Sequence, residues 1–103
     1  MFIKKNQYTP QIIFHPGETL AEKLEEMGLD SRDFAALTGR PEKTIVDVLK
    51  GKTAITPDLA AQFELVTLIP ASFWINGQRL YDEFVAREYY KKSRKTFMEL
   101  QPV

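Results

Sequence analysis

A helix expected over residues 41–49 carries side chains that could read base pairs in the major groove of DNA. Ile45, Val48 and Leu49 have the spacing of a buried helical face. The opposite face then presents two lysines, an aspartate and a valine: Lys43, Val46, Asp47 and Lys50. A lysine can donate to guanine, an aspartate can accept from the amino group of cytosine, and a valine can meet the methyl group of thymine. Three flanking residues are suited to phosphate contacts, which position a protein without reading sequence: Arg40, Thr44 and Lys52.

This helix is the second of a predicted pair. A helix that runs to about Thr38 precedes it, opened by Asp30 as the N-cap with Asp33 three residues on. Gly39 lies in the turn, where a positive φ is expected, and Ala35 lies where the two helices must cross closely. Two short helices joined by a glycine turn have the arrangement of a helix-turn-helix, whose second helix enters the major groove. Such pairs also occur in helical bundles that do not bind DNA, and a mixture of lysine and aspartate is also typical of a solvated helix face. The residues that complete the predicted DNA-binding set are Ser31, Arg32 and Glu42.

Three further helices are expected to complete a compact all-α domain. Their patterns run from residue 16 or 17 to 27, from 57 until Ile69-Pro70, and from 71 to about 92 or beyond. Gly77 interrupts the last helix, so a close packing contact is expected there. The expected core is apolar: Leu20, Leu24, Met27, Phe34, Ala35, Leu37, Ile45, Val48, Leu49, Leu59, Phe63, Val66, Phe73 and Trp74. The chain then divides into an extended N-terminal arm (1–14), a helix-turn-helix domain (15–86) and a basic, aromatic helical extension (87–103).

Composition sets limits on the class of protein. The 103 residues suffice for one domain, and 44% apolar with 27% charged residues is ordinary globular usage. No apolar run approaches a membrane span, no secretory signal is visible and cysteine is absent, so a cytoplasmic location is the default. The net charge is zero, so affinity for nucleic acid must come from local patterning, such as the excess of two positive charges over residues 40–52.

An enzyme is not expected. His15 is the only histidine, so a metal site would need carboxylate partners alone, and we predict a structural or capping role for this side chain. The glutamates of the first helix form a solvated face rather than a paired-carboxylate site. No serine lies in a recognisable triad motif. We therefore expect no catalytic residue, no metal and no cofactor.

The end of the last helix carries more aromatic residues than a small domain can bury within itself. We expect them to form an interface with a second copy or with another protein: Tyr81, Phe84, Val85, Tyr89, Tyr90 and Phe97. A two-fold dimer is the more economical choice, because helix-turn-helix proteins reach two half-sites about 34 Å apart by pairing. The basic residues that follow residue 86 are interpreted as a solvated helix end.

Five motifs together resemble the HigA family of plasmid-maintenance antitoxins, within the lambda-repressor-like, XRE-type regulators. The motifs are His15-Pro16-Gly17-Glu18-Thr19-Leu20, Asp33-Phe34-Ala35, Gly39-Arg40-Pro41-Glu42-Lys43-Thr44-Ile45, Leu49-x-Gly51-Lys52-x-Ala54-Ile55-Thr56-Pro57 and Ile69-Pro70-Ala71-Ser72-Phe73-Trp74. The resemblance covers roughly residues 10–85. It implies a five-helix repressor-like fold, a homodimer on a palindromic operator of double-stranded DNA, and a toxin partner, usually an mRNA-cleaving ribonuclease.

The function that this resemblance implies is a sequence-specific repressor that regulates its own operon and neutralises a toxin. The sequence differs from the family at Ser31, where a glutamine that braces against DNA is common, and at Val46, where a polar residue is common. The last helix resembles that of relatives in which it leads into a zinc-peptidase-like domain, but this sequence has no His-Glu-x-x-His motif. The alternative is a protein-interaction module with weak DNA binding, which neutralises a toxin or docks a longer peptidase-linked regulator.

Overall fold

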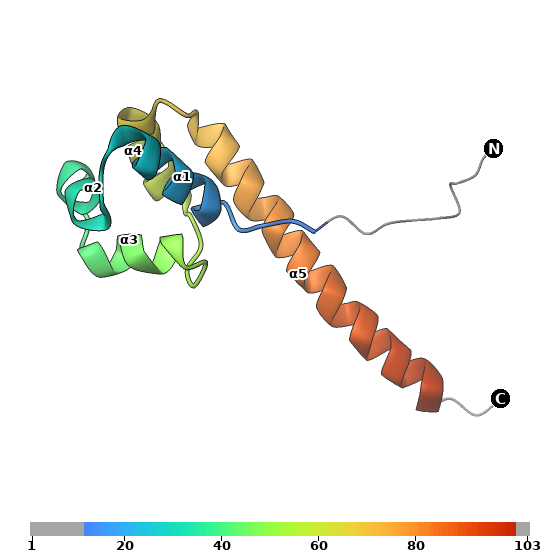
Figure 1. Cartoon of the computed structure of the whole chain (residues 1–103). Helices are drawn as coiled ribbons and strands as arrows, with labels where there is room; N and C mark the ends of the chain where they lie inside the picture. The colour runs from blue at the N-terminus through green and yellow to red at the C-terminus, as the bar shows by residue number, and fades with distance from the viewer. Residues whose placement is uncertain (1–11, 101–103) are drawn as a thin grey trace, which may run out of the picture.

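The structure, a computed structural model, describes residues 12–100, with side chains for residues 12–93. These residues form five α-helices (Figure 1): α1 Gly17–Met27, α2 Ser31–Thr38, α3 Glu42–Leu49, α4 Pro57–Thr67 and α5 Ala71–Leu100. Residues 12–100 contain no strand. The predicted all-α, five-helix fold is confirmed, and the helix boundaries agree closely with those expected from the sequence.

The helix ends follow local sequence signals. Asp30 accepts a hydrogen bond from the backbone N–H of Asp33 at 2.8 Å, and Asp33 accepts one from the backbone N–H of Asp30 at 3.1 Å, which closes a capping box on α2. The side chain of Thr56 caps α4 by accepting from the backbone N–H of Leu59 at 3.2 Å. Gly39 has a φ of 68°, a left-handed conformation that glycine adopts without a steric penalty, so it can form the tight turn between α2 and α3.

A row of three aromatic rings runs through the core. Phe34 of α2, Phe63 of α4 and Trp74 of α5 are fully buried, and successive ring centroids lie 5.2 and 5.5 Å apart. The indole N–H of Trp74 donates to the carbonyl of Ile69 at 3.2 Å, so its polar atom is paired. The other buried apolar residues are Leu20, Leu24, Ala35, Ile45, Val48, Ile55, Leu59 and Ala60. The aromatic row therefore anchors the start of α5 to the helix-turn-helix pair.

The prediction that Leu37 lies in the core is wrong. The buried face of α2 consists of Phe34, Ala35 and Thr38, whereas Leu37 is 59% exposed. Successive helical residues are about 100° apart, so position 37 lies about 200° around the axis from position 35. Thr38 satisfies its buried hydroxyl by donating to the carbonyl of Phe34 at 2.9 Å. A polar residue with a local partner therefore takes the inward position in place of the leucine.

Phe73 and Met27 also lie nearer the surface than predicted. Phe73 is 44% exposed, and its ring meets the edge of Trp74 with the centroids 5.3 Å apart. Met27, the last residue of α1, is 38% exposed. The close packing expected at Gly77 is confirmed, because a Cβ there would lie 3.3 Å from the Cβ of Pro16.

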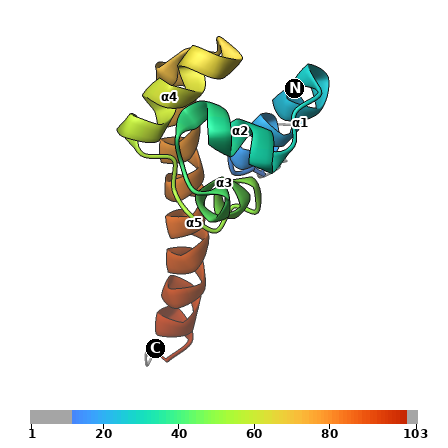
Figure 2. The same ribbon diagram turned by 90° about the vertical axis from the view of Figure 1, so that its left-hand side faces the viewer.

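α5 extends far beyond the other helices. Figures 1 and 2 show α1 to α4 gathered around its N-terminal part, while its C-terminal part projects away from them. The helix continues without a break through residue 86, and the principal dimensions of the molecule are 60 × 36 × 20 Å. None of the helices in residues 12–100 is both long and apolar enough to cross a membrane.

Candidate nucleic-acid interface

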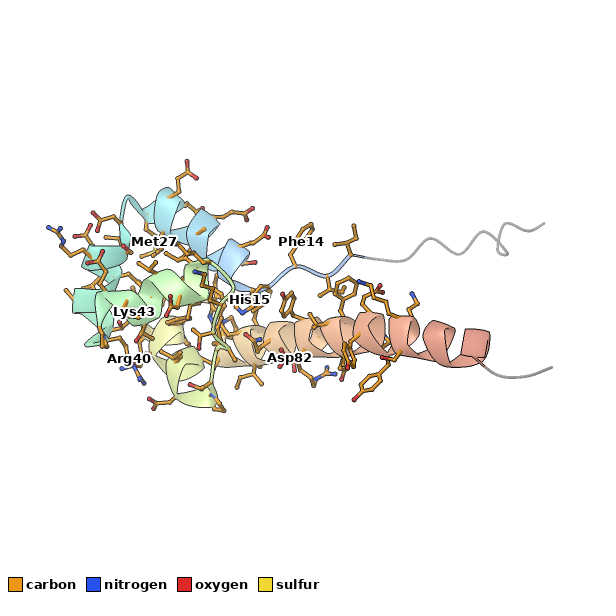
Figure 3. All side chains as sticks on the ribbon, turned by 90° about the horizontal axis from the view of Figure 1, so that it is seen from below. Phe14, His15, Met27, Arg40, Lys43 and Asp82 are labelled. Atoms are coloured by element: carbon orange, nitrogen blue, oxygen red, sulfur yellow. The ribbon has the colours of Figure 1, made fainter. Side chains whose placement is uncertain are left out.

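The exposed face of α3 is the one that the sequence predicts. Ile45 and Val48 are fully buried and fix the orientation of the helix. Lys43 and Lys50 are exposed on the other side, with the half-buried Val46 and Asp47 between them. Figure 3 looks toward this side of the domain, with Lys43 labelled on α3. The four residues proposed to read bases therefore lie together on one accessible face.

Two side-chain contacts lie on and beside this face. The ammonium of Lys43 donates to the carboxylate of Asp47 at 2.9 Å, and their side chains are 84% and 28% exposed. The hydroxyl of Ser31, at the start of α2, donates to the carboxylate of Glu42, at the start of α3, at 2.9 Å. The Ser31 contact ties together the first turns of the two helices of the pair.

The predicted phosphate contacts surround the face but differ in their surroundings. Lys52 is exposed and Thr44 is half-buried, and Arg32, which belongs to the wider predicted DNA-binding set, is exposed. The guanidinium of Arg40 is instead occupied by two side chains of α4: its Nε donates to Gln62 and its Nη2 donates to Asp58. Neither partner could be predicted from the local sequence, because they lie 22 and 18 residues further along the chain. The DNA-binding role of the whole set stays a prediction.

His15 joins three parts of the domain. Its Nδ1 accepts from the backbone N–H of Gly17 at the start of α1 (2.9 Å), and its Nε2 lies 3.1 Å from the carbonyl of Thr53, to which it donates. The ring also packs edge-on against Tyr81 of α5, with the centroids 5.0 Å apart. The structural role predicted for this histidine is confirmed by these contacts. The arrangement connects α1, the turn after α3, and α5.

Burial lowers the pKa of His15 below its ordinary value of 6.5, because desolvation disfavours the charged ring. The carbonyl of Thr53 and the carboxylates of Asp82 and Glu18 act in the opposite direction and are outweighed. Protonation would also place a second N–H against the backbone N–H of Gly17. The neutral ring is therefore the form that fits the fold.

We expect the free energy of unfolding to fall as the pH is lowered from 7.5 through 6.5, because the unfolded chain then binds the His15 proton more readily than the native chain. The loss should level off below the native pKa. Urea unfolding at pH 7.5, 6.5 and 5.5 measures it. A His15→Gln variant should be less stable at pH 7.5, since it cannot make both hydrogen bonds, and should have a flatter pH profile. An equal slope in both proteins would exclude His15 as the cause.

A buried amide on α5 supports the segment that follows α3. The side-chain oxygen of Gln78 accepts from the backbone N–H of Ile55 at 2.8 Å, and its nitrogen donates to Asp82 at 3.0 Å. Gln78 is only 7% exposed. Sequence reasoning missed this residue, because a lone glutamine on a helix carries no signal for a backbone partner 23 residues away.

The residues predicted for a protein interface lie on α5, but Tyr81 packs against His15 of the domain, so it belongs to the part of the helix that the domain covers. Tyr81 and Phe84 are half-buried, whereas Val85, Tyr89 and Tyr90 are 44%, 62% and 66% exposed. The rings of Tyr89 and Tyr90 meet edge to face with centroids 5.0 Å apart. The side chain of Phe97 lies outside the described residues. Val85, Tyr89 and Tyr90 are thus the exposed members of the set, and the partner that would cover them stays a prediction.

Comparison with known proteins gives no matching protein-family model. An uncharacterized HTH-type transcriptional regulator of Escherichia coli K12, YddM, is 29% identical over 79 residues, which are 77% of this chain and 84% of that protein. The structure of an addiction module antidote protein of the HigA family from Coxiella burnetii superposes with a TM-score of 0.75 at 29% identity, covering 90% of this chain and all of the other.

The structure of the Pseudomonas aeruginosa antitoxin HigA with the higBA promoter is also similar. It superposes with a TM-score of 0.70 at 26% identity and covers 89% of this chain and 99% of the antitoxin. The relatives are thus named as a transcriptional regulator and as antitoxins. The resemblance to HigA-type antitoxins is confirmed, and the chain has the helix-turn-helix fold of these lambda-repressor-like regulators.

Proposed function

We propose that the protein is a sequence-specific DNA-binding repressor of the antitoxin type, which reads the major groove with Lys43, Val46, Asp47 and Lys50. The observation that carries the proposal is the accessible face of α3, held outward by the buried Ile45 and Val48 within a fold shared with an antitoxin solved with its promoter. The two lysines supply positive charge, and the half-buried Val46 and Asp47 supply groups that distinguish base pairs.

The proposed regulatory circuit follows from the antitoxin relatives. The protein would bind a palindromic operator in front of its own operon as a homodimer, and would neutralise a toxin, an mRNA-cleaving ribonuclease, through a separate surface. A two-fold dimer suits a palindromic operator, because it presents two copies of α3 to two half-sites. The exposed aromatic residues of α5 provide a surface for the second copy. A protein that represses a bacterial operon acts in the cytoplasm, at the nucleoid.

Replacing Lys43 and Lys50 by alanine tests the groove assignment. We expect each substitution to weaken binding to the upstream duplex by about tenfold or more, and to flatten the dependence of log K on log salt by about one when it removes a charge contact. The measurement is a titration of the duplex at several salt concentrations, with an unrelated duplex as competitor.

Lys23→Ala is the matched control, since Lys23 lies on α1 beside Glu26 and its loss changes the net charge equally. It should leave affinity and salt slope unchanged. Operator binding that survives both α3 substitutions would contradict the groove assignment. Weak and unselective binding by the wild-type protein would contradict the repressor function and favour an interaction module.

A further inference from the structure

Arg40 lies in the turn between α2 and α3, directly after Gly39. Two of its guanidinium nitrogens donate to side chains of α4: Nε to the amide oxygen of Gln62, and Nη2 to the carboxylate of Asp58. The guanidinium side chain is 27% exposed, so α4 covers much of it. Figure 3 shows Arg40 at the end of the domain that also carries Lys43. The cation is therefore held at the edge of the proposed DNA-binding face.

Gln62 fixes the orientation of this cation. Its amide nitrogen donates to the carbonyl of Thr38, the last residue of α2, at 2.8 Å, while its amide oxygen accepts from Arg40. Both polar atoms of the amide are thus committed, and the half-buried side chain has little freedom to rotate. The backbone N–H of Arg40 is itself bound to the carbonyl of Ala35 at 3.1 Å. Hydrogen bonds therefore hold Arg40 both at its backbone N–H and at its guanidinium, which together set the direction of the side chain.

Asp58 has a different character from Gln62. It is the second residue of α4, and its side chain is 79% exposed. A carboxylate and a phosphate both accept hydrogen bonds from the planar fork of a guanidinium. An exposed ion pair is weak, so an incoming anion can replace the carboxylate at low cost. The Asp58 carboxylate therefore has the charge, the geometry and the accessibility of a replaceable phosphate substitute.

We propose that Gln62 and Asp58 control how Arg40 binds the DNA backbone. Gln62 is a positioning residue that aims the guanidinium, and Asp58 is an internal competitor that occupies it until a phosphate takes its place. The inference rests on the proposed function, since it assumes that the turn between α2 and α3 lies against DNA. The exchange lowers the affinity for DNA, because the ion pair with Asp58 must break before a phosphate can bind Arg40.

A double-mutant cycle between Asp58 and Arg40 tests the competitor role. Binding of the upstream duplex is titrated against salt for the full-length wild-type protein, Asp58→Asn, Arg40→Ala and the double variant. We expect Asp58→Asn to bind the duplex about twofold to fivefold more tightly, which is the change in affinity that corresponds to the interaction free energy of an exposed ion pair. Arg40→Ala should bind more weakly, with a salt slope flatter by about one. In the Arg40→Ala background the Asp58 substitution should have no effect.

Two controls separate this mechanism from simple charge. Glu22→Gln removes an exposed carboxylate on α1, away from Arg40, and should leave affinity unchanged. Arg40→Lys keeps the charge but loses the planar fork that Gln62 orients, so it should bind more weakly than the wild-type protein. Thermal melting of each variant verifies that it is folded, and Asp58→Asn is expected to melt slightly lower because an acidic residue leaves the first turn of α4.

The outcomes are distinct. An unchanged affinity for Asp58→Asn, or the same gain in the Arg40→Ala background, would overturn the competitor role. Wild-type affinity for Arg40→Lys would overturn the positioning role of Gln62. If either result appears while Lys43→Ala still weakens binding, the inference fails and the proposed function stands. If the wild-type protein shows no selective binding, both fail together.

Discussion

Replacing Gly17 by alanine is expected to lower the melting temperature by roughly 10–20 °C, because the added methyl group has no room. A Cβ at this position would lie 2.0 Å from the carbonyl oxygen of Val48 and 3.0 Å from its carbonyl carbon. Both are backbone atoms of α3 and cannot turn aside as the end of a flexible side chain would. The start of α1 and the end of α3 must therefore separate.

Overpacking of this kind costs about 1–3 kcal/mol and occasionally more. Alanine recovers at most about 1 kcal/mol over glycine through its higher helix propensity. Because the clash is with backbone atoms of α3, and His15 Nδ1 lies only 3.1 Å from the same Cβ, we expect the cost to exceed that range and the net loss to be about 2–3 kcal/mol. Thermal unfolding followed by circular dichroism measures it directly.

Gly77→Ala is the matched control for this prediction. Both glycines lie in helices at a close contact with another part of the domain, but a Cβ at Gly77 would meet only the side chain of Pro16, at 3.3 Å. A shift of a few tenths of an ångström relieves that contact, and the gain in helix propensity offsets it. We expect a change within about 1 kcal/mol. Equal melting temperatures for Gly17→Ala and the wild-type protein would contradict the described contact between α1 and α3.

The contact at Gly17 illustrates which parts of the fold the sequence could predict. Helix ends were predictable because their signals are local. Asp30 and Asp33, which cap the start of α2, lie three residues apart, and Gly39 and Pro41 mark the turn between α2 and α3. The face of α3 was predictable from periodicity alone. The need for glycine at position 17 was not, because it arises where α1 meets the backbone of α3, some thirty residues further along the chain.

Surroundings of the predicted DNA-binding residues were the least predictable feature. The sequence predicts Arg40 as a phosphate contact, but its two partners on α4 depend on how α4 packs beside α2.

The backbone conformation of Leu68 could not be predicted from the local sequence either. This residue ends α4 with a φ of 64°, a conformation that leucine rarely adopts, and nothing in the local sequence favours it. The buried Thr67 helps to hold this end, since its hydroxyl accepts from the N–H of Ile69 at 3.1 Å.

Truncating the chain before Glu88 is expected to convert the proposed dimer into a monomer. α5 packs on the domain through residues of its N-terminal part, such as Trp74, Gln78 and Tyr81. A projecting helical segment of this length is only marginally stable in water unless its apolar side chains find a partner. The exposed Tyr89 and Tyr90 supply such side chains, and the truncation removes them.

Loss of the dimer should weaken operator binding by about 10²- to 10⁴-fold, because the second half-site is then no longer bound intramolecularly. Sedimentation equilibrium measures the mass, and titration of the operator duplex measures the affinity. The truncation also removes basic residues, so the matched control is the full-length chain with Lys91→Ala and Lys92→Ala, which keeps both tyrosines and should stay dimeric. If the truncated chain remains a dimer, the pairing surface lies elsewhere. Tyr89 and Tyr90 would then be available to the proposed toxin partner, because a dimer that pairs elsewhere leaves both rings exposed.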